Sequence, residues 1–171
     1  STSLANLWRM QALCLALGLG VAWIVSRASI RVLDYLTPMV YGGTLLVLVL
    51  LLFIGRGAGT GQHSKSWIYL GDVSIGQPSE LAKIAVIVML AKVLARRGEA
   101  PTSLAELWRP ALVVGVPWLL IMLQPDLGTG LVFIGIFFAM LYWAGTEWHL
   151  LVLAASPVVS LVMAFSTGLW G

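Results

Sequence analysis

Six long apolar segments constrain the fold of this 171-residue chain more than any other feature of its sequence. They cover residues 10–26, 35–54, 78–95, 110–123, 127–144 and 148–169. Most have the roughly 17–25 residues that a helix needs to cross a bilayer. Because 60% of the residues are hydrophobic and only 10% are charged, a water-soluble domain is excluded. We therefore predict an all-α fold, a polytopic integral membrane helix bundle with six transmembrane helices, in a single domain over residues 1–171.

The basic residues of the loops predict how the segments are oriented. One face of the membrane receives Arg27, Arg31, Lys92, Arg96, Arg97 and Arg109, whereas the other receives Arg9, Arg56 and Lys65. The richer face is cytoplasmic by the positive-inside rule. This predicts an outer loop at about 55–77 and a cytoplasmic loop at about 96–109. Residue 1 then lies outside, which suggests that a preceding helix is missing from the sequence; a true N-out protein is the alternative.

Charge, cysteine and histidine content exclude several classes of function. The formal net charge of +3 is small and its basic residues are scattered, so no nucleic-acid binding is predicted. Cys14 is the only cysteine, which rules out a disulfide within the chain and a cysteine-based metal site. His63 and His149 belong to loops on opposite faces of the predicted topology. No metal site is therefore predicted.

The first candidate for a functional site is the stretch 67–83, W-I-Y-L-G-D-V-S-I-G-Q-P-S-E-L-A-K, where a polar loop leads into an apolar helix. Pro78 suits a first helical turn, and a carboxylate at Glu80 is favoured near the positive end of the helix dipole. Lys83 follows at i+3, close enough to pair with Glu80. Ionisable groups in a membrane segment cost about 2.5–3.5 kcal/mol and often mark functional sites. The alternative is that the pair only neutralises itself near the interface, with Lys83 snorkelling.

The second candidate is the polar run Q-P-D-L-G-T-G at 124–130. The segment before it, 110–123, would extend only about 21 Å as a helix, less than the ~30 Å hydrocarbon core. Pro125 disfavours helix at Gln124, so we predict a helix break below the outer surface. Such backbone survives only when it is buried in protein or lines a wet cavity. Asp126 either caps the following helix or faces a polar cavity, and both candidate stretches map to the outer half of the membrane.

The order and spacing of these motifs closely resemble the SEDS family (shape, elongation, division and sporulation). W-I-Y-L-G at 67–71 is followed by Q-P-S-E-L-A-K at 77–83 and then by Q-P-D-L-G-T at 124–129. The resemblance covers essentially the whole chain and implies an alignment with the second to seventh of the family's roughly ten transmembrane helices. The sequence is therefore expected to be a fragment.

The resemblance implies a function at the bacterial cytoplasmic membrane. It implies a peptidoglycan glycosyltransferase that polymerises lipid II, an undecaprenyl diphosphate-linked disaccharide, at the outer face for cell wall synthesis and cell shape. A class B penicillin-binding protein is the implied partner, together with membrane lipid. The cofactor is left open, and a divalent cation is one candidate.

By motif position, the resemblance implies substrate-binding or functionally sensitive roles for Glu80, Lys83, Asp126, Gln124 and Trp67. The family's presumed catalytic aspartate is expected in an outer loop beyond Gly171, so no catalytic residue is assigned and the fragment is expected to be inactive alone. Ser66, where the family commonly has arginine, and an extra Gly76 leave the detail of the outer loop open.

Two other classes of function remain as alternatives. A lipid flippase or transporter would use a polar cavity in the outer half of the membrane, with the broken helices forming its site. Such a protein needs access from both faces, whereas the polar residues of these segments cluster on one side. A scaffold that only binds a partner helix is the third interpretation, and it applies to the fragment alone.

Overall fold

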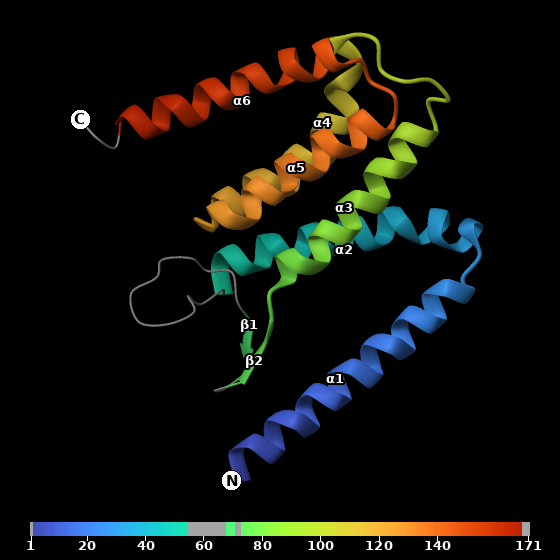
Figure 1. Cartoon of the computed structure of the whole chain (residues 1–171), viewed down its shortest axis with the longest axis vertical. Coiled ribbons are helices and arrows are strands. Elements are labelled where there is room, and N and C mark those ends of the chain that lie inside the picture. The colour runs from blue at the N-terminus through green and yellow to red at the C-terminus, as the bar shows by residue number, and fades with distance from the viewer. Residues whose placement is uncertain (1, 55–67, 71–72, 169–171) are drawn as a thin grey trace. The chain divides into compact units, whose positions relative to one another are not determined.

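The computed structural model describes residues 2–54, 68–70 and 73–168, in two units, Ser1–Leu36 and Thr37–Gly171. The helices are α1 (Thr2–Arg27), α2 (Ile30–Ile54), α3 (Pro78–Ala95), α4 (Trp108–Met122), α5 (Leu127–Trp143) and α6 (Trp148–Gly168), with a short 3₁₀ helix η1 (Leu104–Leu107) before α4. Strands β1 (Ile68–Leu70) and β2 (Val73–Gly76) form an antiparallel hairpin (Figure 1). The six predicted helices are confirmed, whereas the hairpin inside the predicted outer loop was not foreseen.

Three of the described helical stretches are long and apolar enough to cross a membrane: Trp8–Arg27, Ile30–Phe53 and Leu104–Met122. The third joins η1 to α4, so the prediction that this segment is too short to span was wrong. The 3₁₀ helix η1 lengthens the helical segment at its N-terminal side. The sequence did not predict this extension because Pro110 marked the predicted start of the helix. The predicted break after it is confirmed, because α4 ends at Met122 and α5 begins at Leu127.

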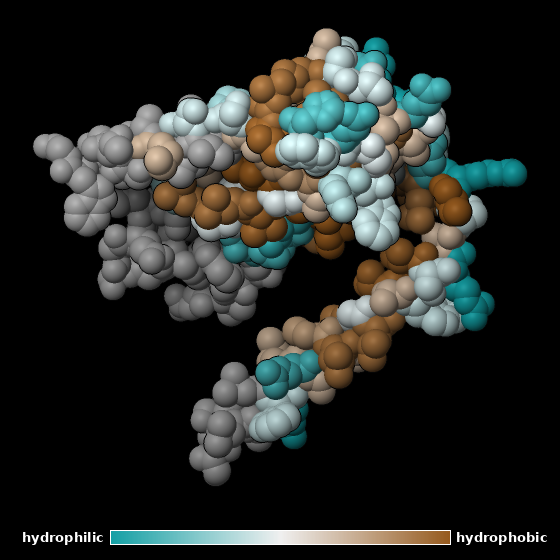
Figure 2. All heavy atoms as spheres, turned by 45° about the horizontal axis from the view of Figure 1, so that its top comes forward, coloured by the Kyte–Doolittle hydropathy of each residue, from teal (hydrophilic) through white to brown (hydrophobic). Residues whose placement is uncertain are grey.

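The outer surface of the helices is apolar, as expected for contact with lipid. In Figure 2, α1 is hydrophobic along its middle and carries hydrophilic residues near its two ends. Three tryptophans stand at helix ends and are largely exposed: Trp108 opens α4, Trp143 closes α5 and Trp148 opens α6. Tryptophan at such positions is typical of the membrane–water interface.

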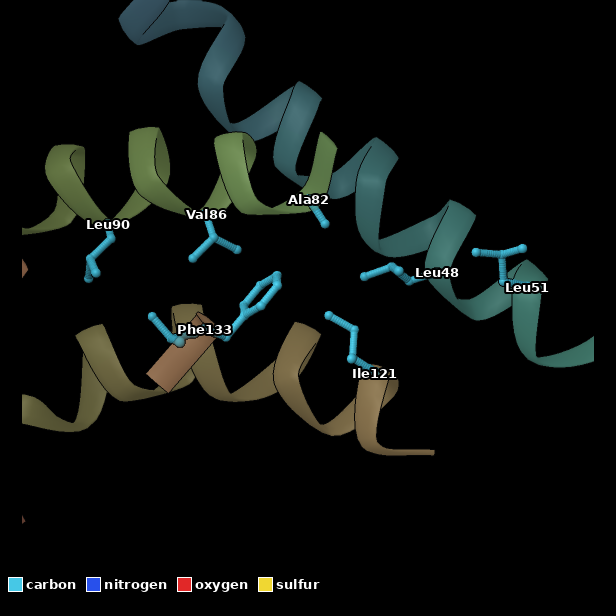
Figure 3. Packing of buried hydrophobic residues seen from close by; sticks show 8 residues of the cluster. Leu48, Leu51, Ala82, Val86, Leu90, Ile121 and Phe133 are labelled. Carbon is cyan, nitrogen blue, oxygen red and sulfur yellow. The ribbon is translucent and has the colours of Figure 1, made fainter. Parts of the chain in front are cut away.

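The second unit is held together by a buried apolar cluster contributed by α2, α3, α4 and α5 (Figure 3). Its fully buried members are Leu48, Leu51, Ala82, Val86, Leu90, Val114, Ile121 and Phe133. Phe133 of α5 is the largest of them and has no exposed surface. Packing of this kind, together with interhelical hydrogen bonds, is what joins helices in a bilayer.

Two polar side chains add hydrogen bonds between α2 and α4. The amide Nε2 of Gln124 donates to the backbone carbonyl of Leu48 over 3.1 Å, and the Tyr41 hydroxyl donates to the carbonyl of Val113 over 2.9 Å. Gln124 is only 1% exposed, so its polar group is satisfied inside the protein. The Gln124 bond fixes the start of the α4–α5 break against α2, and the Tyr41 bond joins α2 to the first half of α4.

Replacing Phe133 by alanine tests the role of the buried cluster. The large cavity removes contacts from four helices, and we expect the free energy of unfolding in detergent micelles to fall by about 2 kcal/mol or more. Phe53→Ala is the matched control, since Phe53 is 80% exposed on α2. Equal losses for the two variants in a thermal or denaturant titration would contradict this packing.

Gln124 provides a second test. Gln124→Leu keeps the shape but removes the donor to Leu48, and we expect a loss of about 1–2 kcal/mol in the free energy of unfolding. Gln124→Glu sets a buried carboxylate against a carbonyl oxygen, so the loss should be larger. The same unfolding measurement ranks the two variants, and a Gln124→Glu protein as stable as Gln124→Leu would refute the placement.

Candidate functional site

The start of α3 follows the chemistry of its sequence. Gln77 is the N-cap residue, with extended backbone, and Pro78 begins the helix. The backbone N–H of Glu80 donates to the carbonyl of Gln77 over 3.0 Å. Proline suits this turn because its missing N–H would have no partner inside the helix. The prediction that a helix begins here is confirmed.

Glu80 and Lys83 form an ion pair one turn into α3. The Lys83 Nζ lies 2.7 Å from Oε2 and 2.8 Å from Oε1 of Glu80. The Lys83 side chain is 22% exposed and the Glu80 side chain 59%. The predicted pairing at i+3 is therefore confirmed, with the carboxylate as the more solvent-accessible partner.

The break between α4 and α5 is organised by Asp126, the N-cap residue of α5. Its Oδ1 accepts a hydrogen bond from the backbone N–H of Thr129 over 3.1 Å. Its Oδ2 accepts one from the Thr129 hydroxyl over 2.8 Å. A carboxylate is favoured at this position because it satisfies a free N–H and faces the positive end of the helix dipole. Of the two predicted placements for Asp126, the cap is the one observed.

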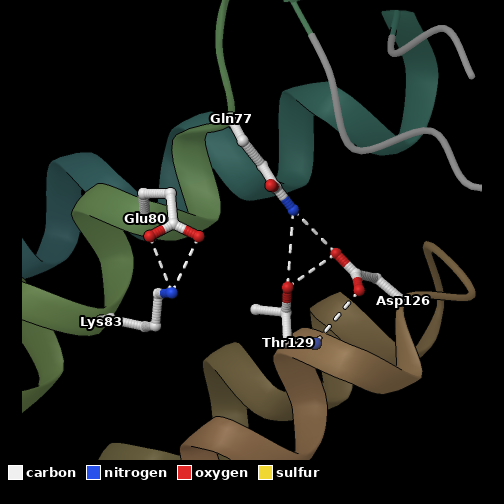
Figure 4. Close-up of polar contacts among 5 residues, drawn as sticks. All are labelled: Gln77, Glu80, Lys83, Asp126 and Thr129. Atoms are coloured by element: carbon white, nitrogen blue, oxygen red, sulfur yellow. Dashed lines mark hydrogen bonds and ion pairs between the residues drawn. The ribbon is translucent and has the colours of Figure 1, made fainter. Parts of the chain in front are cut away.

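The two sequence motifs meet through Gln77. Its amide Nε2 donates to Oδ2 of Asp126 over 2.8 Å and contacts Oγ1 of Thr129 at 3.4 Å. The Glu80–Lys83 pair projects from α3 beside this cluster (Figure 4). Residues that are 49 positions apart in the sequence are thus joined by a direct side-chain contact.

The predicted site residues are not all part of this cluster. Glu80, Lys83 and Asp126 lie at the same end of the second unit, whereas Gln124 is buried and bonded to Leu48. Trp67 lies outside the described residues. The functional roles of all five remain predictions.

Sequence reasoning missed Gln77 and Thr129 as members of the cluster. Both stand inside the quoted motifs, but a glutamine before a proline and a threonine in a first helical turn have common local roles. The spacing of Thr129 three residues after Asp126 is a capping pattern and was the available signal. Nothing local distinguishes Gln77 from Gln124, since each is followed by proline.

Together, the contacts of Gln77, Asp126 and Thr129 and the neighbouring Glu80–Lys83 pair present two carboxylates, one ammonium group, an amide and a hydroxyl. These groups are suited to orient a polar, hydroxyl-bearing molecule and to stabilise one anionic group at Lys83. Within the described residues, no group of three or more His, Cys, Asp or Glu side chains is placed to hold a metal ion.

Comparison with known sequences identifies several bacterial relatives. The chain is 36% identical over 153 residues to a probable peptidoglycan glycosyltransferase FtsW of Coxiella burnetii, covering 87% of this chain and 40% of the relative. It is 32% identical over 158 residues to the peptidoglycan glycosyltransferase MrdB of Escherichia coli strain K12, covering 91% and 40%. The chain thus spans about 40% of the length of these relatives.

Solved structures show the same fold. The rod shape determining protein RodA of Thermus thermophilus matches with a TM-score of 0.71 and 34% identity, over 88% of this chain and 48% of that one. A chain from a structure describing the coordination of polymerization and crosslinking by a peptidoglycan synthase complex matches with a TM-score of 0.72 and 34% identity, over 94% and 45%.

The family model for FtsW, RodA and SpoVE, described as cell cycle protein, matches residues 2–169. The predicted membrane bundle is confirmed by this match, by the apolar helices and by the RodA fold. The chain is a multi-pass protein of the bacterial inner membrane. It belongs to the FtsW/RodA/SpoVE family of cell cycle proteins, which is the SEDS family that its motifs resemble.

Proposed function

We propose that the full-length protein carrying this chain is a peptidoglycan glycosyltransferase that polymerises lipid II at the outer face of the cytoplasmic membrane, for cell wall synthesis and cell shape. The names of the FtsW and MrdB relatives support this activity. The observation in this chain that carries the proposal is the contact between its two motifs, which gathers Glu80, Lys83 and Asp126 at one end of the helices.

The cluster fits the demands of that reaction. Glycosyl transfer breaks the bond between the sugar and the polyprenyl diphosphate, which leaves, while the attacking acceptor hydroxyl gives its proton to a general base that is not assigned among the residues of this chain. Lys83 stabilises the developing phosphate charge, and Glu80 holds the ammonium group in place. Asp126 orients the substrate. A divalent cation sharing the phosphate charge is compatible with this assignment.

The proposed partner is a class B penicillin-binding protein that crosslinks the glycan strand as it is made. The similarity to a chain from a structure of a peptidoglycan synthase complex supports it, because that complex combines polymerization with crosslinking. Glu80, Lys83 and Asp126 belong to the polymerising half of such an assembly.

Lys83→Ala in the full-length protein should abolish lipid II polymerisation while membrane insertion is retained. Removing one preorganised electrostatic contact from a transition state costs about 10²–10³ in kcat. Gel analysis of glycan strands measures the product, and Lys92→Ala, in the last turn of the same helix, is the control. Unchanged polymerisation by Lys83→Ala would remove the role assigned to this residue.

Exchanging the two charges separates chemistry from helix stability. The double variant Glu80→Lys/Lys83→Glu keeps an i,i+3 pair but places a lysine near the positive end of the helix dipole, so we expect only a small loss of thermal stability. Polymerisation should remain at least about tenfold reduced, because the ammonium group is one turn from its proper place. Wild-type activity would show that the pair is only structural.

The flippase alternative is tested with proteoliposomes that contain the full-length wild-type protein. They are assayed for transfer of fluorescent lipid II between leaflets and for glycan synthesis. We expect glycan strands with no accelerated transfer. Transfer without polymerisation would support the transporter interpretation instead.

A further inference from the structure

The residue that begins α3 carries a side chain that does not cap its own helix. Gln77 has extended backbone (φ −108°, ψ 109°) and makes no side-chain cap hydrogen bond to α3. N-cap positions usually hold Ser, Thr, Asp or Asn, whose short side chains reach their own backbone. The longer side chain of Gln77 points instead to the start of α5 (Figure 4). Its amide therefore connects two helices rather than ending one.

Asp126 receives this amide with a carboxylate that is engaged on both oxygens. Oδ1 accepts from the backbone N–H of Thr129, and Oδ2 accepts from the Thr129 hydroxyl and from Gln77. All three donors are neutral, and hydrogen bonds that end on an ionised group are stronger than those between neutral groups. Thr129 is itself only 9% exposed, so its hydroxyl is directed at Asp126 from inside the protein.

We propose that Gln77 is a positioning residue, whose amide clamps Asp126 to the first turn of α3 and so sets where this carboxylate lies relative to the Glu80–Lys83 pair. The clamp consists of Gln77, Asp126 and Thr129. Glu80 lies in the first turn of the same helix and Lys83 follows at i+3, so the contact at Gln77 fixes both charged groups against Asp126. Without it, α3 and α5 are still joined by their buried apolar side chains, which resist sliding less specifically than a directed hydrogen bond.

The other end of the clamp packs against the end of α4. A Cβ atom on Gly130, next to Thr129, would meet the terminal methyl of Met122, so the Met122 side chain would have to move aside. The end of α4 is in turn bonded to α2 through Gln124. The position of Asp126 is thus set by packing on the α4–α5 side, and Gln77 transmits that position to α3.

The substitution Gln77→Glu tests the clamp through its chemistry rather than its shape. The introduced carboxylate faces Oδ2 of Asp126, and two ionised carboxylates at this spacing repel each other. At low pH the pair shares one proton, and the protonated side chain donates again. The clamp of this variant is therefore closed at low pH and opens as the pH rises.

The double variant Gln77→Glu/Asp126→Asn restores the contact with donor and acceptor exchanged. The asparagine amide at position 126 donates to the carboxylate at position 77, and its oxygen still accepts from the backbone N–H of Thr129. The Thr129 hydroxyl, which donates to Asp126 in the wild type, donates instead to the carboxylate at position 77, because the side chain at that position lies beside it. The two side-chain shapes and the total charge are those of the wild type. Recovery in this variant requires that the two side chains touch.

The contribution of the clamp to stability is measured as the melting temperature in detergent at pH 5 and pH 8. Each variant is compared with the wild type at the same pH. We expect Gln77→Glu to lose about 5 °C at pH 8 and much less at pH 5, and the double variant to recover most of the loss at pH 8. Ala105→Glu, exposed in η1, adds a carboxylate away from the clamp and should show no such pH dependence. A Gln77→Glu protein that matches the wild type at both pH values, or a double variant no better than Gln77→Glu, would overturn the clamp.

The positioning role of Gln77 in catalysis rests on the proposed function. It is tested by measuring lipid II polymerisation by the full-length protein. Misplacing Asp126 should lower kcat of Gln77→Glu about tenfold or more at pH 8, with little change in KM and with recovery relative to the wild type at pH 5. Wild-type kcat in a variant whose clamp has opened would overturn the positioning role. If the wild-type protein makes no glycan, the proposed function fails and the catalytic role falls with it, while the thermal series still decides the clamp.

Discussion

The carboxylate of Asp126 is the group on which the arrangement of this end of the molecule depends. It ends the irregular stretch between α4 and α5, caps α5 through Thr129 and accepts the amide of Gln77 from α3. Broken backbone between membrane helices needs partners for its polar groups, because lipid supplies none. In the break, the backbone N–H groups of Gln124 and Asp126 donate to the carbonyl of Ile121. The Asp126 side chain accepts from the backbone N–H of Thr129 and brings α3 to the break through Gln77. The contacts that join α3 to α5 are therefore the same contacts that position the Asp126 carboxylate.

The buried cluster below this contact explains why a few hydrogen bonds suffice to position charged groups. Phe133 lies one turn beyond Thr129 in α5 and packs among side chains from α2, α3 and α4. Apolar packing brings the helices together but does not specify their register in a bilayer, where lipid tails are as apolar as leucine. The directed bonds of Gln124 and Gln77 supply that specificity at opposite ends of the break. Apolar packing and these hydrogen bonds together hold the helix ends that carry Asp126 and the Glu80–Lys83 pair.

The parts of this structure that were predictable are those with local causes. Apolar length predicted the six helices, Pro125 predicted the break, and the i+3 spacing predicted the pair between Glu80 and Lys83. The contact between Gln77 and Asp126 depends on how α3 packs against α5, which no local pattern contains. For the same reason, the sequence did not show that Gln124 turns inward to Leu48 rather than joining the cluster. The 3₁₀ turn before α4 was missed because it lies in the predicted cytoplasmic loop, while Pro110 marked the predicted start of the helix.

The exposure of the ion pair bears on how the proposed reaction uses it. Among the described residues, this site carries two carboxylates and one ammonium group, so a diphosphate bound under the proposed function would meet a cation that already has a partner. Glu80 is the more exposed member, at 59%, and exposed ion pairs contribute only about 0–1 kcal/mol. A phosphate group can therefore displace the Glu80 carboxylate into water at little cost, while Lys83, at 22% exposure, keeps its place on the helix. Under the proposed function, Glu80 would hold the ammonium group in place between turnovers, and Asp126 would stay in position as the phosphate binds.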